Sequence, residues 1–208
     1  MKRKKRNVLL MVFVVTILGL LSVQPVYAGY RPFDWDFEHN MYPTVFSVTE
    51  ADKVLGLMEI KGDSLIGINY AWLCVGEERT VPSYADNYKV KIGFDGQLKY
   101  EFGAFWEFLG DKAVVLVFVA LFSTSEHLIA QKLVYSDWIT TGTEDVTKNF
   151  YDEDMYVINY RVSGGHTYLF AVKLYVELRY KSHIRSQNSI FDPATFLVTY
   201  IGWGYLGP

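Results

Sequence analysis

Residues 167–181, TYLFAVKLYVELRYK, decide the fold class of this 208-residue chain. Their apolar and polar side chains alternate, which is the period of a half-buried β-strand. The charged side chains Lys173, Glu177, Arg179 and Lys181 share one face. The other face is wholly apolar or aromatic, with Tyr168, Phe170, Val172, Leu174, Val176, Leu178 and Tyr180. We therefore expect a strand with one side in a hydrophobic core.

The same alternation runs through most of the chain after residue 28. Asp95-Gly96 lies between alternating runs at residues 88–94 and 98–102, a pattern typical of a hairpin. The turn Ser163–His166, with two glycines, predicts a second hairpin between the strands Met155–Val162 and Thr167–Lys181. Further strands are expected at Thr44–Thr49, Val54–Lys61, Leu65–Val75, Ala113–Phe122, Leu128–Tyr135 and Phe196–Tyr205. About nine or ten strands predict an all-β fold, a single antiparallel β-sandwich of jelly-roll type.

Residues 1–28 have the order of a secretory signal peptide. Five basic residues (2–6) precede an apolar run from Val8 to Leu21, and the segment ends on the small residue Ala28. We expect cleavage after Ala28, which leaves residues 29–208 as one β-sandwich domain. If the segment were kept instead, it would be a membrane anchor, although it is short for a spanning helix. The predicted location is extracellular, either secreted or on the cell surface.

Charge and cysteine content exclude several classes of function. The chain has 20 basic and 23 acidic residues, and removal of five basic ones leaves 15 against 23, a net charge of −8. An acidic surface repels phosphate backbones, so nucleic acid is not an expected partner. A single cysteine, Cys74, excludes a disulfide framework. Cys74 lies in an expected strand, in register with Ile66, Ile68, Tyr70 and Trp72, so we predict that it is a buried packing residue on the inward face of that strand.

Catalytic motifs are missing from the sequence. Residues 62–67, GDSLIG, differ from a nucleophile elbow because the second glycine comes one residue too late. Glu126-His127 lacks the second histidine of a zincin helix. We therefore predict no enzyme and no catalytic residues, although a pair of carboxylates for glycoside hydrolysis is left open, since its separation is spatial.

Two segments predict association with a protein partner. Phe33, Trp35 and Phe37 alternate with acidic residues, so they form one aromatic face of an extended segment. That strand packs on its own domain or adds to the sheet of a neighbouring subunit. Ala113–Phe122 is apolar on both faces, which fits a central strand or a strand that meets a partner or a membrane. The leading hypothesis is a non-catalytic surface protein that binds itself or another surface protein through strand edges or aromatic faces.

Acidic clusters predict a calcium site as the only cofactor, although a solubilising surface explains them more simply. The candidate ligands are Asp34, Asp36 and Glu38 near the start of the mature chain, and Asp152, Glu153 and Asp154 before the strand at Met155.

Two further functions stay open at this point. The first is a secreted carbohydrate-binding module, with Trp203, Tyr205 and other tyrosines stacked on the sugars of a polysaccharide. The second is a small outer-membrane β-barrel, in which the face from Tyr168 to Tyr180 would contact lipid.

Overall fold

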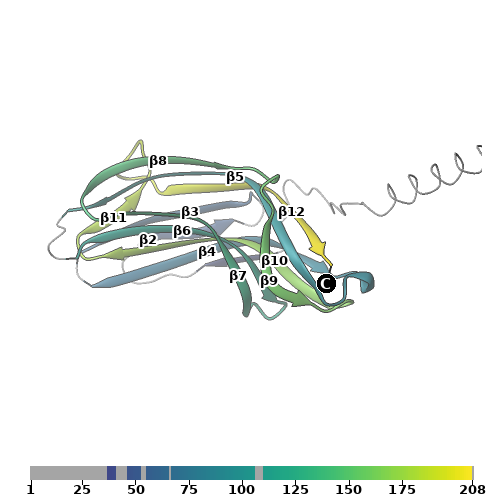
Figure 1. The fold of residues 1–208 in the computed structure, drawn as a ribbon. Helices are drawn as coiled ribbons and strands as arrows, with labels where there is room; N and C mark the ends of the chain where they lie inside the picture. The colour runs from purple at the N-terminus through teal and green to yellow at the C-terminus, as the bar shows by residue number, and fades with distance from the viewer. Residues whose placement is uncertain (1–36, 41–45, 53–54, 66, 106–109, 208) are drawn as a thin grey trace, which may run out of the picture.

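The computed structural model of this chain describes residues 37–40, 46–52, 55–65, 67–105 and 110–207 (Figure 1). The predicted signal segment, residues 1–28, lies outside the described residues, as do Phe33, Asp34, Trp35 and Asp36. The described chain forms strands and one short 3₁₀ turn, η1 (Ser83–Ala85). The strands are β1 (Phe37–Asn40), β2 (Phe46–Asp52), β3 (Leu57–Ser64), β4 (Ile68–Thr80), β5 (Tyr88–Ala104), β6 (Lys112–Ser123), β7 (Leu128–Ile139), β8 (Gly142–Phe150), β9 (Tyr156–Val162), β10 (Thr167–Arg179), β11 (Ser182–Arg185) and β12 (Ala194–Leu206).

These strands build two antiparallel sheets. Sheet A has the order β1-β4-β10-β6-β7. In sheet B, β3 pairs with β2 on one edge and with both β11 and β12 on the other, while β5 pairs with β11, β12, β8 and β9. Thus β11 and β12 lie end to end between β3 and β5, and β8 and β9 lie end to end beside β5. The twelve described strands occupy ten positions, in agreement with the predicted number.

The path of the chain between the sheets is that of a jelly roll. From β3 onward the chain passes to the other sheet at each connection between positions, except at the β6–β7 hairpin within sheet A. Two Greek keys wound in this way place β10 between β4 and β6 and place β11 and β12 between β3 and β5. The all-β sandwich and its jelly-roll type are confirmed.

The core lies between the two sheets, and β10 supplies much of it. Its side chains from Tyr168 to Leu178, taken alternately, are buried, as the sequence pattern predicts. They face sheet B, so the alternative in which they face lipid is wrong. Tyr180 breaks the pattern because it follows β10 with a positive φ of 52° and is partly exposed. Strand β6 is an inner strand of sheet A, as expected for Ala113–Phe122, and its alternate residues Ala113, Val115, Val117, Val119 and Leu121 enter the same core.

Both predicted hairpins are wrong, although the turn residues mark real features. Asp95-Gly96 lies inside the continuous strand β5, at the point where β8 gives way to β9 and where β12 shifts register after Val198. Asp95 Oδ1 accepts a hydrogen bond from the backbone N–H of Asp152, 2.8 Å away, and thus ties the break between β8 and β9 to β5. The Ser163–His166 turn links β9 in sheet B to β10 in sheet A, so it joins the sheets and does not close a hairpin.

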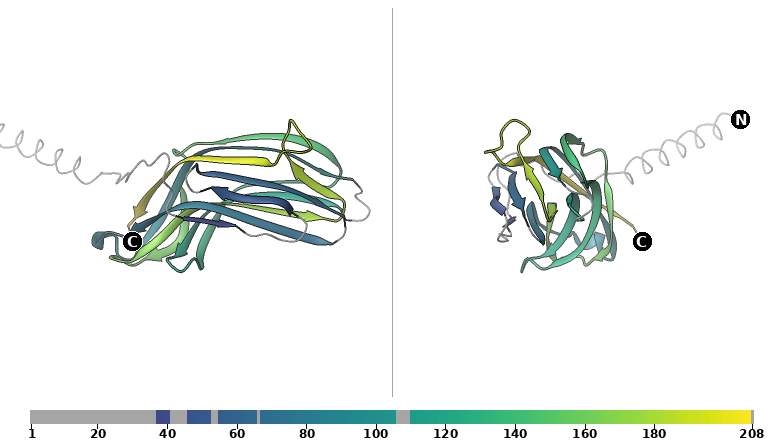
Figure 2. Two further views of the ribbon diagram at one scale, coloured as in Figure 1. Left: turned by 180° about the vertical axis from the view of Figure 1, so that it is seen from behind. Right: turned by 90° about the vertical axis from the view of Figure 1, so that its left-hand side faces the viewer.

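The sandwich is arched. Both side views show the strands bending toward the side of sheet A at the end that carries the C-terminus (Figures 1 and 2). No helix within the described ranges has the length and apolar character needed to cross a bilayer.

Candidate binding face on sheet A

The outward face of sheet A carries a pair of stacked tyrosines. Tyr70 on β4 and Tyr175 on β10 have ring centroids 6.0 Å apart and planes only 17° from parallel. They are diagonal neighbours, because Tyr70 is paired with Glu177 and Tyr175 with Trp72. Tyr70 is 47% exposed, so one partner of the stack is offered to solvent.

A second aromatic platform lies on the edge strand of the same face. Trp138 on β7 is 59% exposed, and the Lys112 ammonium lies 5.0 Å from the centroid of its ring. Trp138 is the cross-strand partner of Val114, Val114 is the partner of Glu177, and Glu177 is the partner of Tyr70. The two platforms therefore lie in one row of paired residues that crosses four strands. Three strand spacings separate Tyr70 from Trp138, about 14 Å.

Polar groups lie between the platforms. The Glu177 carboxylate accepts hydrogen bonds from Arg179 Nε at 2.5 Å and from the Tyr175 hydroxyl at 3.1 Å. Burial, followed by the charge of Glu177, raises the pKa of Tyr175 to about 12. The phenol is thus a neutral donor that holds Glu177 in place, and this arrangement gives the face fixed donors and acceptors beside its rings.

The face is concave because sheet A bends toward it. Trp72 is paired with Tyr175, and Phe122 is paired with Leu169, six residues away along β10. In a flat sheet, six residues along the strand would separate the backbones of Trp72 and Phe122 by about 20 Å. The centroids of their rings are nevertheless only 6.3 Å apart. Between them lies a row of small residues, Gly76, Ala171 and Ala120. A Cβ at Gly76 would lie 2.3 Å from the carbonyl oxygen of Phe170, so this position needs glycine.

Lys173 lies beside the bend and is only 8% exposed. Its ammonium is 4.8 Å from the Trp72 ring centroid and 5.7 Å from that of Phe118, and it donates a hydrogen bond to Gln131 Oε1 at 3.3 Å. Burial lowers the pKa of Lys173. Cation–π contacts and one amide thus replace much of the water that this amine has lost.

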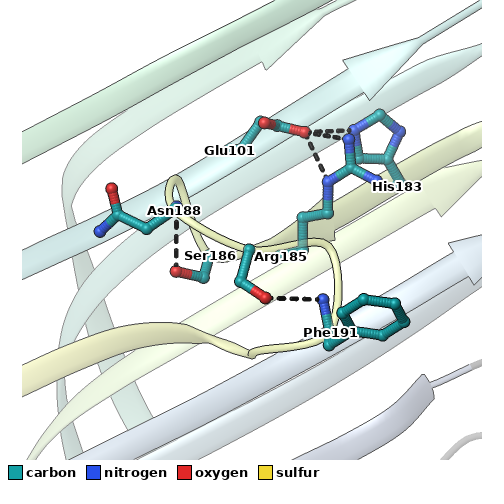
Figure 3. Close-up of polar contacts among 7 residues, drawn as sticks. Glu101, His183, Arg185, Ser186, Asn188 and Phe191 are labelled. Carbon is teal, nitrogen blue, oxygen red and sulfur yellow. Dashed lines mark hydrogen bonds and ion pairs between the residues drawn. The ribbon is translucent and has the colours of Figure 1, made fainter.

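A separate polar cluster lies on the outward face of sheet B. Glu101 on β5 accepts hydrogen bonds from Arg185 Nε at 2.5 Å and from His183 Nε2 at 3.2 Å, and both side chains point at the one carboxylate (Figure 3). Burial, followed by the charge of Arg185, lowers the pKa of His183. A Cβ at Gly103 would lie 2.4 Å from the imidazole, which therefore fills the space over the strand. The cluster joins β11 to β5 through side-chain hydrogen bonds, so its role is structural.

The loop that follows this cluster interrupts what would otherwise be one strand from β11 to β12. Phe191 in this loop is 79% exposed, and its carbonyl oxygen accepts a hydrogen bond from Lys61 Nζ at 3.0 Å. Within the loop, Ser186 Oγ accepts a hydrogen bond from the backbone N–H of Asn188, and Ser189 Oγ accepts one from that of Phe191 (Figure 3).

The predicted partner-binding segment is described only from Phe37 onward. Phe37 and Glu38 belong to β1, where they pair with Gly76 and Val75 at the edge of their own sheet. Phe33 and Trp35 lie outside the described residues. The described part of the segment thus extends the domain's own sheet, and strand addition to a neighbouring subunit stays a prediction.

The predicted calcium ligands do not come together where they are described. Asp152, Glu153 and Asp154 occupy the turn between β8 and β9, and no group of three or more His, Cys, Asp or Glu side chains in the described ranges is arranged to hold a metal ion. Asp34 and Asp36 lie outside the described residues, and the structure describes Glu38 only through its backbone pairing in β1. A calcium site at the start of the mature chain therefore stays a prediction.

Of the aromatic residues that the sequence predicted for a stacking role, Trp203 does not face solvent. Trp203 is only 3% exposed, and the Arg79 guanidinium covers its ring at 4.5 Å from the centroid. Tyr70 and Trp138, which do face solvent, were not singled out. Alternation does not show that Tyr70 is exposed, because both faces of β4 are rich in apolar residues.

Comparisons with known proteins give only distant likenesses. No protein-family model matches the chain, and no curated protein matches it. A family 11 carbohydrate-binding module from Clostridium thermocellum, solved with a mixed-linked tetrasaccharide, aligns with 89% of this chain and 94% of its own at 10% identity and a TM-score of 0.29. The xylan-binding module CBM15 aligns with 88% and 97% at 8% identity and a TM-score of 0.29, and an infectious bursal disease virus structure aligns with 88% and 41% at 11% identity and 0.33. At such low TM-scores these likenesses carry no argument about function, and the fold class rests on the strand pairing of the chain itself.

Proposed function

We propose that this protein is an exported, non-catalytic module that binds a polysaccharide on the outward face of sheet A. The observation that carries this proposal is the row from Tyr70 through Glu177 and Val114 to Trp138, with an exposed aromatic ring at each end. Export is the part that rests on the sequence, through the signal-like order of residues 1–28.

The chemistry of the row suits a sugar chain. One surface of a sugar ring is made of C–H groups and packs on an aromatic face, while its hydroxyls need donors and acceptors nearby. Tyr70 and Trp138 offer the faces, and Glu177 and Arg179 between them offer the polar partners. The rings stand on strands of a packed sheet and so lose little conformational entropy when a ligand binds.

The experiment compares Trp138→Ala with Tyr151→Ala. Both side chains are 59% exposed, but Tyr151 lies in the turn between β8 and β9, away from the outward face of sheet A. Affinity electrophoresis of the purified protein through gels that contain soluble polysaccharides is expected to show retardation by at least one of them. Trp138→Ala should weaken that binding about tenfold or more, as for a central aromatic contact, while Tyr151→Ala should leave it unchanged.

Two results would contradict the proposal. If no polysaccharide in a broad panel retards the protein, the proposed function fails. If Trp138→Ala and Tyr151→Ala bind alike, binding takes place on a different surface.

A further inference from the structure

The charges on the outward face of sheet A differ in balance from the rest of the protein. The chain after residue 28 has a net charge of −8, yet this face carries more cations than anions on the strands whose outward side chains are described. The titratable cations and carboxylates there are Lys112, Lys173 and Arg179 against Glu78 and Glu177. Because Lys173 is buried, the accessible cations and carboxylates of this face balance, whereas the protein as a whole is acidic.

Two of these cations are placed side by side. Lys112 on β6 is the direct cross-strand partner of Arg179 on β10. Like charges in directly opposed positions destabilise an antiparallel pair, so this placement has a cost for folding. The fold does not neutralise it fully, because Glu177 is bonded to Arg179 and no described residue forms an ion pair with Lys112.

The pair also adjoins the aromatic row. Lys112 lies over the ring of Trp138, and Arg179 reaches Glu177, which is in the same row as that ring. The Arg179 side chain is 40% exposed, so it is accessible to a ligand as well as bonded to Glu177. A negative group bound between Lys112 and Arg179 would relieve their repulsion and form charge-assisted hydrogen bonds.

We infer that the ligand of this face is an acidic polysaccharide, whose anionic substituents bind between Lys112 and Arg179 while a sugar ring stacks on Trp138. This inference rests on the proposed function and adds the chemical class of the sugar. Carboxylates of uronic acids and sulfate esters share the chemistry that the pair recognises.

The test uses the purified protein with three probes: polygalacturonate for carboxylates, dextran sulfate for sulfate esters, and unmodified dextran as a neutral chain. Titration calorimetry at low ionic strength should show binding to an acidic chain at least about tenfold tighter than to the neutral one. Which of the two acidic probes binds more tightly identifies the anionic group. Added salt should weaken the interaction, because it screens exposed charges.

Lys112→Gln is the informative variant, and Lys99→Gln is its matched control. Both remove one positive charge, but Lys99 is exposed on β5 in sheet B. We expect Lys112→Gln to weaken binding to the acidic chain about five- to tenfold and to reduce its dependence on salt, while Lys99→Gln has no such effect. Lys112→Gln removes the positive charge opposite Arg179, so we expect this variant to be no less stable than the unchanged protein. Thermal melting of the variant checks this.

The outcomes separate the two levels of the hypothesis. Binding that is equal for neutral and acidic chains, or that Lys112→Gln and Lys99→Gln change alike, overturns the acidic preference and leaves the polysaccharide proposal in place. No binding to either acidic probe likewise overturns the acidic preference, and no binding to any polysaccharide of the broad panel overturns both.

Discussion

His183 is a residue whose protonation state should control stability. It is buried against Gly103 and bonded to Glu101, and burial together with Arg185 lowers its pKa. The folded state therefore favours the neutral imidazole, while the unfolded chain binds a proton at the ordinary pKa of about 6.5. The stability that this group contributes is complete above that pH and is lost as the pH falls toward the folded-state pKa.

We expect the free energy of unfolding to decrease when the pH falls below about 6.5, and His183→Gln to flatten part of that dependence. Urea unfolding at a series of pH values measures it. His166→Gln is the control, because His166 is exposed in the turn before β10. An unchanged pH profile in His183→Gln would contradict the assignment.

Single residues were the hardest level to predict from sequence. The alternation in β10 correctly placed Tyr168 to Leu178 in the core. The same reasoning failed on β4, where Cys74 is buried as expected but Ile68 and Tyr70, on the same face, are exposed. Cys74 is buried in a cluster with residues of the neighbouring strands, whereas Ile68 and Tyr70 are not part of that cluster. Such a cluster depends on which strands lie side by side, and the local sequence pattern does not record this.

At the scale of elements, the bend of sheet A depends on the small residues that lie across it. Gly76, Ala171 and Ala120 are paired in one row, and a Cβ at Gly76 would meet backbone and Cβ atoms of the neighbouring strand within 3 Å. Backbone cannot move aside as a flexible side chain can. Gly76→Ala should therefore destabilise the protein by about 1–3 kcal/mol and disturb the contact between Trp72 and Phe122.

Gly202→Ala is a suitable comparison on β12, because the nearest atoms to its new Cβ belong to the Tyr200 side chain, at 3.2 Å. Denaturant unfolding gives the two stability changes. The chain has five tryptophans, so the environment of Trp72 is read from the difference in fluorescence between each variant and the same variant with Trp72→Phe. Equal stability changes for the two variants would mean that the bend does not depend on Gly76.

Element types were predictable, but their connections were not. Asp95-Gly96 and Ser163–His166 have the composition of hairpin turns, yet one is a break in the pairing along β5 and the other a crossing between sheets. A turn sequence favours a local change of direction or a special φ, such as the 78° of Gly165. Which strand pairs next is decided by tertiary contacts.

For the molecule as a whole, alternation and turn spacing predicted a jelly-roll sandwich because that fold buries one face of many amphipathic strands. The proposed binding face lies on the other side of sheet A, where only the small cluster around Cys74 is buried. Its aromatic rings, Tyr70 and Trp138, are exposed because they do not pack in the core. Its cations, Lys112 and Arg179, are not fully neutralised by the fold. Sequence patterns that report burial therefore predict the core and leave such a face undetected.

Cys74 offers a test of how cooperatively the whole sandwich opens. Its side chain is fully buried in a small apolar cluster beneath the bend, and its strand, β4, lies between β1 and β10. If the sheets unfold together, a thiol reagent reaches Cys74 only in the globally unfolded state. The free energy from the labelling rate should then equal that from equilibrium unfolding and fall with denaturant along the same slope. Phe191→Cys in a Cys74→Ala background gives the rate for an exposed thiol, since Phe191 is 79% exposed. Faster labelling of Cys74 that does not depend on denaturant would show instead a local opening, as expected if the edge strand β1, which pairs with β4 at Cys74, detaches alone. Strand exchange with a neighbouring subunit requires such an opening.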